Sequence, residues 1–135
     1  MGCPESVDFK DLVKRDDVYF KKLTDVPFTG KTTGENQGSF RNGKKDGPWV
    51  GYNKDGQLWF KGTYKDGKVE GPWVTYHDNG QLRTKGTIKD GKKDGPWVRY
   101  HENGQLWSKG IYKDGDRDGS WVWFHDNGQL YFICM

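Results

Sequence analysis

A 24-residue repeat constrains this chain more than any other feature of its sequence. Residues 71–94 read GPWVTYHDNGQLRTKGTIKDGKKD, and aligned copies begin at Gly47, Gly95 and Gly119. A partial copy, GSFRNGKKD, lies upstream at 38–46. Fixed periods of this length are typical of repeat arrays, in which each unit packs on its neighbours instead of on a central core. We therefore expect a repeat array over residues 38–135, with units starting near 47, 71, 95 and 119, and an N-terminal leader or cap over residues 1–37.

Each unit contains two Asx-Gly pairs, and the spacing between successive pairs alternates between 13 and 11 residues. Such pairs tolerate positive φ angles and are the strongest short signal for a β-hairpin. Two turns in each unit predict two strands, and the frequent Gly and Pro residues argue against helix. The expected fold class is all-β, an elongated single-sheet antiparallel meander of β-hairpin repeats.

Side-chain alternation favours three-residue loops at both kinds of turn. The loop 78–80, with Gly80 in a left-handed bulge, places Tyr76 opposite Leu82 and keeps apolar residues on one face. The same loop length at 65–67 places tryptophan and lysine side chains together on the other face. In this register each tryptophan lies across from a lysine of the neighbouring strand, in the pairs Trp49–Lys61, Trp73–Lys85 and Trp97–Lys109.

The unit GxWxxYHxNGQLxxKGxYKDGKxD resembles the bacterial variant of the MORN repeat, found in proteins of the YwqK-type antitoxin family. The resemblance covers Gly38 to Leu130, and residues 12–31 are similar to the segment that precedes the repeats in such proteins. It implies a sheet of MORN-type hairpins that binds a macromolecular partner, with a protein toxin as the leading candidate. MORN-type repeats have also been thought to bind acidic lipids, so a membrane-associated module is the alternative.

The predicted tryptophan and lysine face has two interpretations. Cation–π pairs across neighbouring strands would cover and stiffen a thin sheet. Alternatively, the same side chains form a binding strip, because tryptophan is a favoured interface anchor and lysine attracts acidic partners. The candidate binding residues are Trp49, Trp73, Trp97, Lys61, Lys85 and Lys109.

Composition narrows the class of partner. The chain is only 32% hydrophobic, with a mean hydropathy of −1.05, yet 16% of its residues are aromatic and seven are Trp. Burial is therefore expected from a few large rings instead of an aliphatic core. The 22 basic and 19 acidic residues leave a net charge of +3. That balance is too even to predict nucleic-acid binding.

Neither a metal site nor an active site is expected. His77, His101 and His125 recur at the repeat period, about 9.6 Å apart on alternate strands. Ligands of one zinc ion lie ~2 Å from the metal, so we interpret these histidines as surface consensus residues. Residues 114–119 match the first half of an EF-hand loop, but His125 stands where calcium requires a bidentate Glu. With no nucleophile motif, phosphate loop or dinucleotide fingerprint, we expect no cofactor and no catalysis.

The N-terminal residues MGCPES allow three interpretations. They fit an N-myristoylation pattern, a bacterial lipoprotein whose mature chain starts at Cys3, or a fortuitous cysteine near an engineered start. Localisation is accordingly either the bacterial cell envelope or the cytoplasm. No transmembrane run or intact signal peptide is present in the sequence, and Cys3 and Cys134 are expected to be too far apart for a disulfide.

The ends of the array are expected to differ from its middle. Residues 8–15 predict one or two helical turns with Ser6 as a candidate N-cap, and 18–20 predict a strand. At the far end, residues 131–135 form an apolar run where other units carry polar residues. An apolar edge strand invites pairing with another chain, so we expect that this edge is covered by a partner or by a second copy of the chain, or that it docks back onto the sheet.

Overall fold

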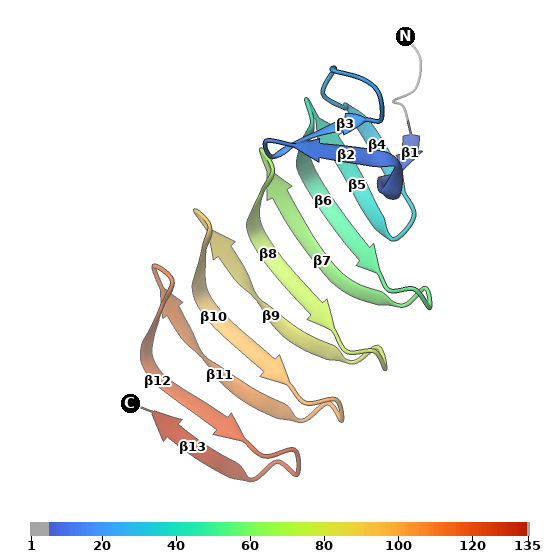
Figure 1. Ribbon diagram of the computed structural model, residues 1–135. Coiled ribbons are helices and arrows are strands. Elements are labelled where there is room, and N and C mark those ends of the chain that lie inside the picture. Colours follow the sequence, from blue (N-terminus) through green and yellow to red (C-terminus); the bar gives the residue numbers. More distant parts are fainter. Residues whose placement is uncertain (1–5, 135) are drawn as a thin grey trace. The chain divides into compact units, whose positions relative to one another are not determined.

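The computed structural model describes residues 6–134, which form β-strands, turns and a single 3-10 helix (Figure 1). The described residues divide into two compact units, the first ending at Lys68 and the second beginning at Val69. The predicted all-β class and the predicted meander of hairpin repeats are both confirmed.

The first unit combines a five-stranded sheet with a separate two-stranded hairpin. Its elements are β1 (Ser6–Asp8), η1 (Phe9–Asp11), β2 (Leu12–Arg15), β3 (Val18–Lys21), β4 (Gly30–Thr33), β5 (Asn36–Arg41), β6 (Lys44–Tyr52) and β7 (Leu58–Lys65). The sheet has the order β1-β4-β5-β6-β7, and β2 pairs only with β3. The β1–β4 pair is parallel, and the other pairs of this unit are antiparallel.

The second unit contains hairpin strands in sequence order. These are β8 (Lys68–Tyr76), β9 (Leu82–Lys89), β10 (Lys92–Tyr100), β11 (Leu106–Lys113), β12 (Asp116–Phe124) and β13 (Leu130–Cys134). Each strand pairs antiparallel with the next one along the chain.

Two kinds of turn alternate along the chain. The Asp90-Gly91 turn has φ angles of 51° and 78°, and its flanking residues Lys89 and Lys92 pair directly. Two successive positive φ angles define a type I′ turn, whose twist matches that of the flanking strands. The prediction of a three-residue loop at 65–67 is therefore wrong, because Asp66 and Gly67 form the same two-residue turn, with φ angles of 51° and 85°.

The other turn follows the prediction, but a bulge lies beside it. Gly80 has a φ angle of 86°, and Tyr76 pairs with Leu82 across the loop, as expected. The next pair is Thr75 with Thr84, which leaves Arg83 as an extra residue on its strand. Such a bulge shifts every later pair by one position.

This one-residue shift makes the predicted Trp–Lys pairing wrong. Trp49 lies across from Gly62, Trp73 from Gly86 and Trp97 from Gly110. The lysines lie across from valines, in the pairs Val50–Lys61, Val74–Lys85 and Val98–Lys109. Because side chains alternate between faces along a strand, the tryptophans and these lysines point to opposite faces of the sheet.

The buried core lies on the tryptophan side of the sheet. Trp49 is only 1% exposed, and Trp97 and Trp121 occupy the same position in later repeats. The indole N–H of each donates to a carbonyl of the preceding strand, with acceptors at Ser39 (3.0 Å), Thr87 (3.1 Å) and Ile111 (3.1 Å). Large rings thus supply the burial, as the composition predicts.

The N-terminal segment covers the tryptophan side of the first unit, where the β2–β3 hairpin lies across the sheet (Figure 1). The ring of Phe9 packs against Phe40 and Trp49, with centroid distances of 6.3 and 6.0 Å. Only the short η1 forms in the segment predicted to be helical, and Asp8, not Ser6, caps it by accepting from the Lys10 N–H. The predicted strand at 18–20 is confirmed as part of β3.

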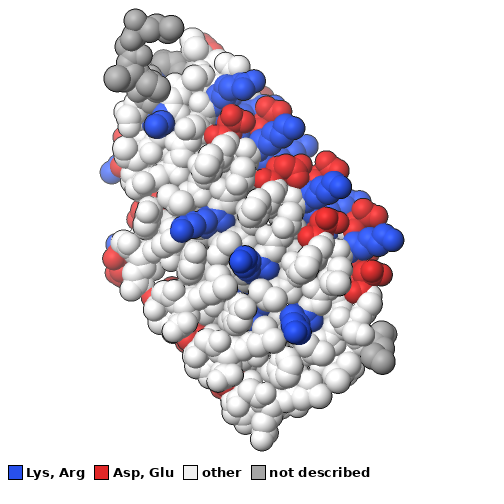
Figure 2. Space-filling model, turned by 180° about the vertical axis from the view of Figure 1, so that it is seen from behind, with Lys and Arg blue, Asp and Glu red and all other residues white. Residues whose placement is uncertain are grey.

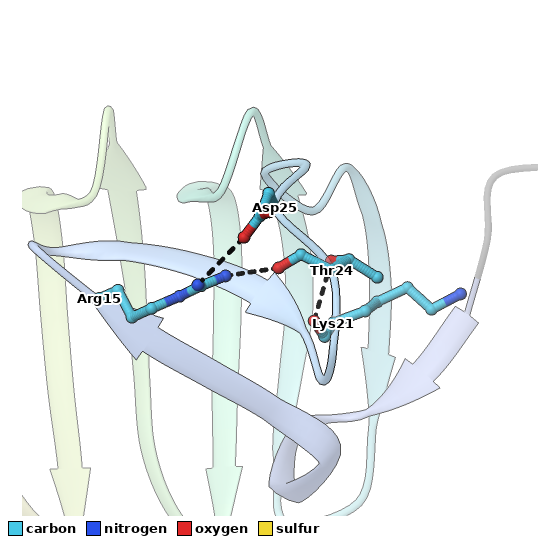
Figure 3. Close-up of polar contacts among 4 residues, drawn as sticks. All are labelled: Arg15, Lys21, Thr24 and Asp25. Carbon is cyan, nitrogen blue, oxygen red and sulfur yellow. Dashed lines mark hydrogen bonds and ion pairs between the residues drawn. The ribbon is translucent and has the colours of Figure 1, made fainter.

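Arg15 holds the loop that follows β3 (Figure 3). Its guanidinium donates to the Thr24 carbonyl at 2.5 Å and lies 3.3 Å from the Asp25 carboxylate. The Thr24 hydroxyl in turn donates to the Lys21 carbonyl at 2.9 Å. These contacts hold the loop that connects β3 to β4.

The predictions about Gly2 and Cys3 concern residues outside the described part of the chain. Cys134 is exposed and carries a free thiol. Within residues 6–134, no helix has the length and apolar character needed to span a bilayer.

Candidate interaction surface

A groove of about 330 Å³ opens on the tryptophan side of the second unit. We call this side the Trp face and define it by Trp97 and Trp121; the opposite side, with Lys85 and Lys109, is the Lys face. Hydroxyl residues, cations and aromatic rings line the groove together. They are Thr75, Thr84 and Ser108, then Arg83, Lys93 and Arg99, and finally Trp97, Tyr112 and Trp121.

Small residues of the second unit create the depth of this groove. Ser108 is 2% exposed, and the Thr75 and Thr84 hydroxyls lie 2.5 Å apart in a hydrogen bond. Two repeats earlier, the position of Ser108 is held by Phe60, whose ring fills the space above Gly51. The exchange of a buried ring for a hydroxymethyl group leaves room in the second unit.

Cations lie over the aromatic rings of the groove. Lys93 Nζ lies 5.0 Å from the Trp97 ring centroid and 5.1 Å from that of Tyr112. Arg117 lies over Trp121 at 5.3 Å in the same way. Cation–π contacts therefore exist, but in the Lys93–Trp97 and Arg117–Trp121 pairs the cation precedes the tryptophan by four residues on the same strand. The repetition of Lys45, Lys93 and Arg117 at one position of the unit was the sequence signal for them.

The structure does not gather the six predicted binding residues on one surface. Trp49 is buried beneath the N-terminal segment, Trp97 is 7% exposed at the groove, and Trp73 is half-buried. Each exposed lysine lies on the face opposite the tryptophans of its own unit. Lys61 belongs to the first unit, and Lys85 and Lys109 belong to the second. A role for these residues in binding stays a prediction. The strand register excludes a single binding strip that contains both the tryptophans and the lysines.

The side of the molecule away from the N-terminal hairpin differs from the groove in how its charged side chains are distributed. Figure 2 shows separate basic side chains on a largely uncharged surface, and a dense band of alternating acidic and basic groups along one margin. The isolated basic groups lack the clustering typical of a nucleic-acid site.

Two of the three histidines, His77 and His101, link successive hairpins of the second unit. His77 Nε2 donates to the Tyr100 carbonyl at 2.8 Å, and His101 Nε2 donates to the Phe124 carbonyl at 2.8 Å. Asn79 bonds the Glu102 carbonyl of the next hairpin at 2.7 Å. The description of His77 and His101 as mere surface residues is therefore incomplete, because both are half-buried and hold adjacent repeats together.

The acidic stretch 114–119 forms hairpin structure. Asp114 and Gly115 make a type I′ turn with φ angles of 52° and 88°, and Asp116 to Gly119 belong to the extended β12. Extended backbone cannot wrap its alternate side chains around one ion as a calcium loop does. Among the described residues, no three His, Cys, Asp or Glu side chains are close enough to hold a metal ion.

In the first unit, the residues that correspond to Lys93, Trp97 and Tyr112 of the groove are Lys45, Trp49 and Tyr64, and there the lysine is enclosed by aromatic rings. Lys45 Nζ lies 5.3 Å from the Phe9 ring centroid, 4.8 Å from Trp49 and 4.9 Å from Tyr64. Burial lowers the pKa of Lys45, and the nearby charge of Lys14 lowers it further. Burial likewise raises the pKa of Tyr64 because it penalises the phenolate form.

One protein family matches the chain over well more than half of its length. The family described as MORN repeat variant matches residues 45–66, 69–90, 93–114 and 117–135, and each match includes the tryptophan of its unit. No curated protein matches the chain significantly. Four successive matches, together with the hairpin repeats of the structure, show that this chain belongs to the MORN repeat variant family.

Proposed function

We propose that the protein is a non-enzymatic repeat scaffold that binds a protein partner through the groove on the Trp face of its second unit. The observation that carries this proposal is the lining of the groove. Trp97 and Trp121, which are 7% and 5% exposed, form the aromatic floor of the groove, and Arg83, Lys93 and Arg99 surround it with positive charge. Aromatic residues and arginine dominate the energetics of protein interfaces, especially in pockets that exclude water.

The two units differ in whether this face is available. In the first unit, the chain's own N-terminal segment covers Trp49 through Phe9. In the second unit, the groove over Trp97 remains open to solvent. The Thr84 hydroxyl already bonds Thr75 and Ser108 is buried, so Arg83, Lys93 and Arg99 are the polar groups that the groove offers to a partner.

The class of partner is proposed from the resemblance to bacterial antitoxins. In that role, the partner would be a protein toxin whose surface enters the groove. The basic groove supports an acidic contact surface on such a partner, because opposite charges accelerate association.

A membrane-associated function is the second candidate, and the Lys face supports it. Lys85 and Lys109 are exposed on alternate strands of that face. Each basic side chain near an anionic bilayer is worth about 1 kcal/mol, so these two lysines favour attachment to acidic lipids. This candidate uses the opposite side of the sheet, and the two functions can therefore be separated by mutation.

The test compares three baits: the full chain, Arg83→Glu/Arg99→Glu on the Trp face, and Lys85→Glu/Lys109→Glu on the Lys face. Each is incubated with lysate of its native cell and, separately, with vesicles that contain phosphatidylserine. We expect the full chain and the Lys-face variant to retain the same protein, and the Trp-face variant to lose it. Retention by all three baits, or binding only to vesicles that is lost with the Lys-face variant, would overturn the proposal.

A further inference from the structure

The groove wall of the second unit repeats a cage that is complete in the first unit. Lys45, Trp49 and Tyr64 lie two repeats before Lys93, Trp97 and Tyr112. Lys45 Nζ is surrounded by three rings, with centroid distances of 5.3, 4.8 and 4.9 Å. Lys93 Nζ has two matching rings, at 5.0 and 5.1 Å.

The third ring of the first cage is Phe9, which comes from outside the repeats. Phe9 lies in η1, and η1 adjoins Glu35 and Asn36, which share a small cavity with Asp8 and Lys10. Two repeats later, the positions of Glu35 and Asn36 are Arg83 and Thr84, and both line the open groove. The groove therefore lies where the first unit holds a short segment that presents an aromatic side chain.

The charges around the two sites differ in a way that defines the occupant. In the first unit the three aligned positions are Glu35, Lys45 and Gly51, which together are neutral. In the second unit they are Arg83, Lys93 and Arg99, which carry three positive charges. In η1, Lys10 lines the same cavity as Glu35. A similar segment in the second unit would meet Arg83 instead, so a negative residue is favoured at that position.

Building on the proposed protein-binding function, we propose that the groove receives an aromatic side chain from an acidic segment of the partner protein. The aromatic ring lies over Trp97 and closes the cage around Lys93, as Phe9 does around Lys45. Acidic residues on either side of the ring meet Arg83 and Arg99. A second copy of this chain is disfavoured as the occupant, because its Phe9 is already half-buried against its own Phe40 and Trp49.

A labelled peptide tests this assignment on the full chain. The probe is the chain's own segment 6–12 with Lys10→Glu, SVDFEDL, and its binding is followed by fluorescence anisotropy. A matched peptide replaces Phe9 with Ala, and a third keeps Lys10. We expect the probe to bind, the Phe9→Ala peptide to bind at least about tenfold more weakly, and added salt to weaken binding of the probe. Equal binding of the first two peptides, or no binding, would overturn the assignment.

A charge-reversal variant tests the location. Arg83→Glu/Arg99→Glu replaces the two arginines that line the groove with acidic residues. We expect this variant to bind the probe more weakly, and Lys109→Glu on the opposite face to bind as the full chain does. Undiminished binding by the folded double variant would refute the location. If the double variant does not fold, Arg83→Glu provides the test, with weaker binding expected and unchanged binding as the contrary result.

The outcomes separate this assignment from the proposed function. If the Arg83→Glu/Arg99→Glu variant loses the partner protein but the peptide does not bind the full chain, the scaffold function stands and the proposed aromatic occupant is wrong. If the peptide binds in the groove but the partner protein is still retained by the Arg83→Glu/Arg99→Glu variant, the proposed function is wrong and the groove is only a peptide site.

Discussion

The indole ring of Trp97 covers Gly86 so closely that a Cβ atom on this glycine would lie 2.1 Å from Trp97 Cδ2. The same ring donates its N–H to the carbonyl of Thr87, the next residue, at 3.1 Å. Equivalent contacts recur for Gly38 with Trp49 and for Gly110 with Trp121. The tryptophan of one strand thus packs directly on a glycine of the preceding strand, and this contact repeats along the chain.

Gly86→Ala should destabilise the second unit. The added methyl group must displace the indole of Trp97, and overpacking of this kind costs about 1–3 kcal/mol. Urea unfolding measures the change in the free energy of unfolding. Thr87→Ala is the matched control, because the Thr87 side chain is exposed and only its carbonyl accepts the indole bond. A cost for Gly86→Ala no larger than that of the control would contradict the contact.

His77→Ala should lower stability by about 1 kcal/mol, the usual net worth of a hydrogen bond. The substitution removes the donor to the Tyr100 carbonyl, which lies in the next hairpin. His125→Ala is the control, because that histidine is exposed and its ring packs against Tyr131 at 4.8 Å. Thermal unfolding of both variants checks the expectation. Equal shifts in Tm would show that the inter-hairpin bond contributes nothing.

Lys45 should titrate below its ordinary pKa of 10.5, because burial and the charge of Lys14 both disfavour its protonated form. Between the lowered pKa and 10.5, the folded protein binds fewer protons at Lys45 than the unfolded chain does. The contribution of Lys45 to stability therefore increases as the pH rises through that window. NMR titration of labelled lysine side chains measures the pKa directly.

Removal of the Phe9 ring should raise the pKa of Lys45 toward 10.5, because Phe9→Ala exposes the ammonium group to water. Lys14→Gln should raise it by less, since the charge of Lys14 is the smaller of the two causes. A titration unaffected by Phe9→Ala would show that the ring does not enclose Lys45. Tyr64 opposes the stability trend above pH 10, because its raised pKa keeps a proton on the folded state.

The last strand of the second unit should promote self-association. Tyr131 and Ile133 in β13 are 66% and 48% exposed, and β13 is the final strand in the order. Exposed apolar edge strands pair readily with a second chain. We expect the sedimentation coefficient to rise with protein concentration, and Ile133→Lys to suppress the rise. Gln129→Lys, in the preceding turn, adds the same charge outside the strand and should leave the association intact.

The sequence by itself determined the hairpin repeats of this chain. The period of the Asx-Gly pairs defines the hairpins, because Asn or Asp followed by Gly accepts the positive φ angles of tight turns. The loop at 78–80 and the pairing of Tyr76 with Leu82 follow from side-chain alternation alone. The presence of four MORN-type units could also be read directly, since each copy resembles the others.

The tertiary structure decided the assignment of residues to faces and the location of the groove. One bulge at Arg83 moves Trp73 from Lys85 to Gly86, and a period-2 pattern offers no warning of a single extra residue. Phe9 has no repeat partner in the sequence, so its place over Lys45 depends on how the N-terminal segment packs. The groove itself arises where Ser108 replaces the buried ring of Phe60, a difference in volume that acquires meaning only once the neighbouring strands surround it.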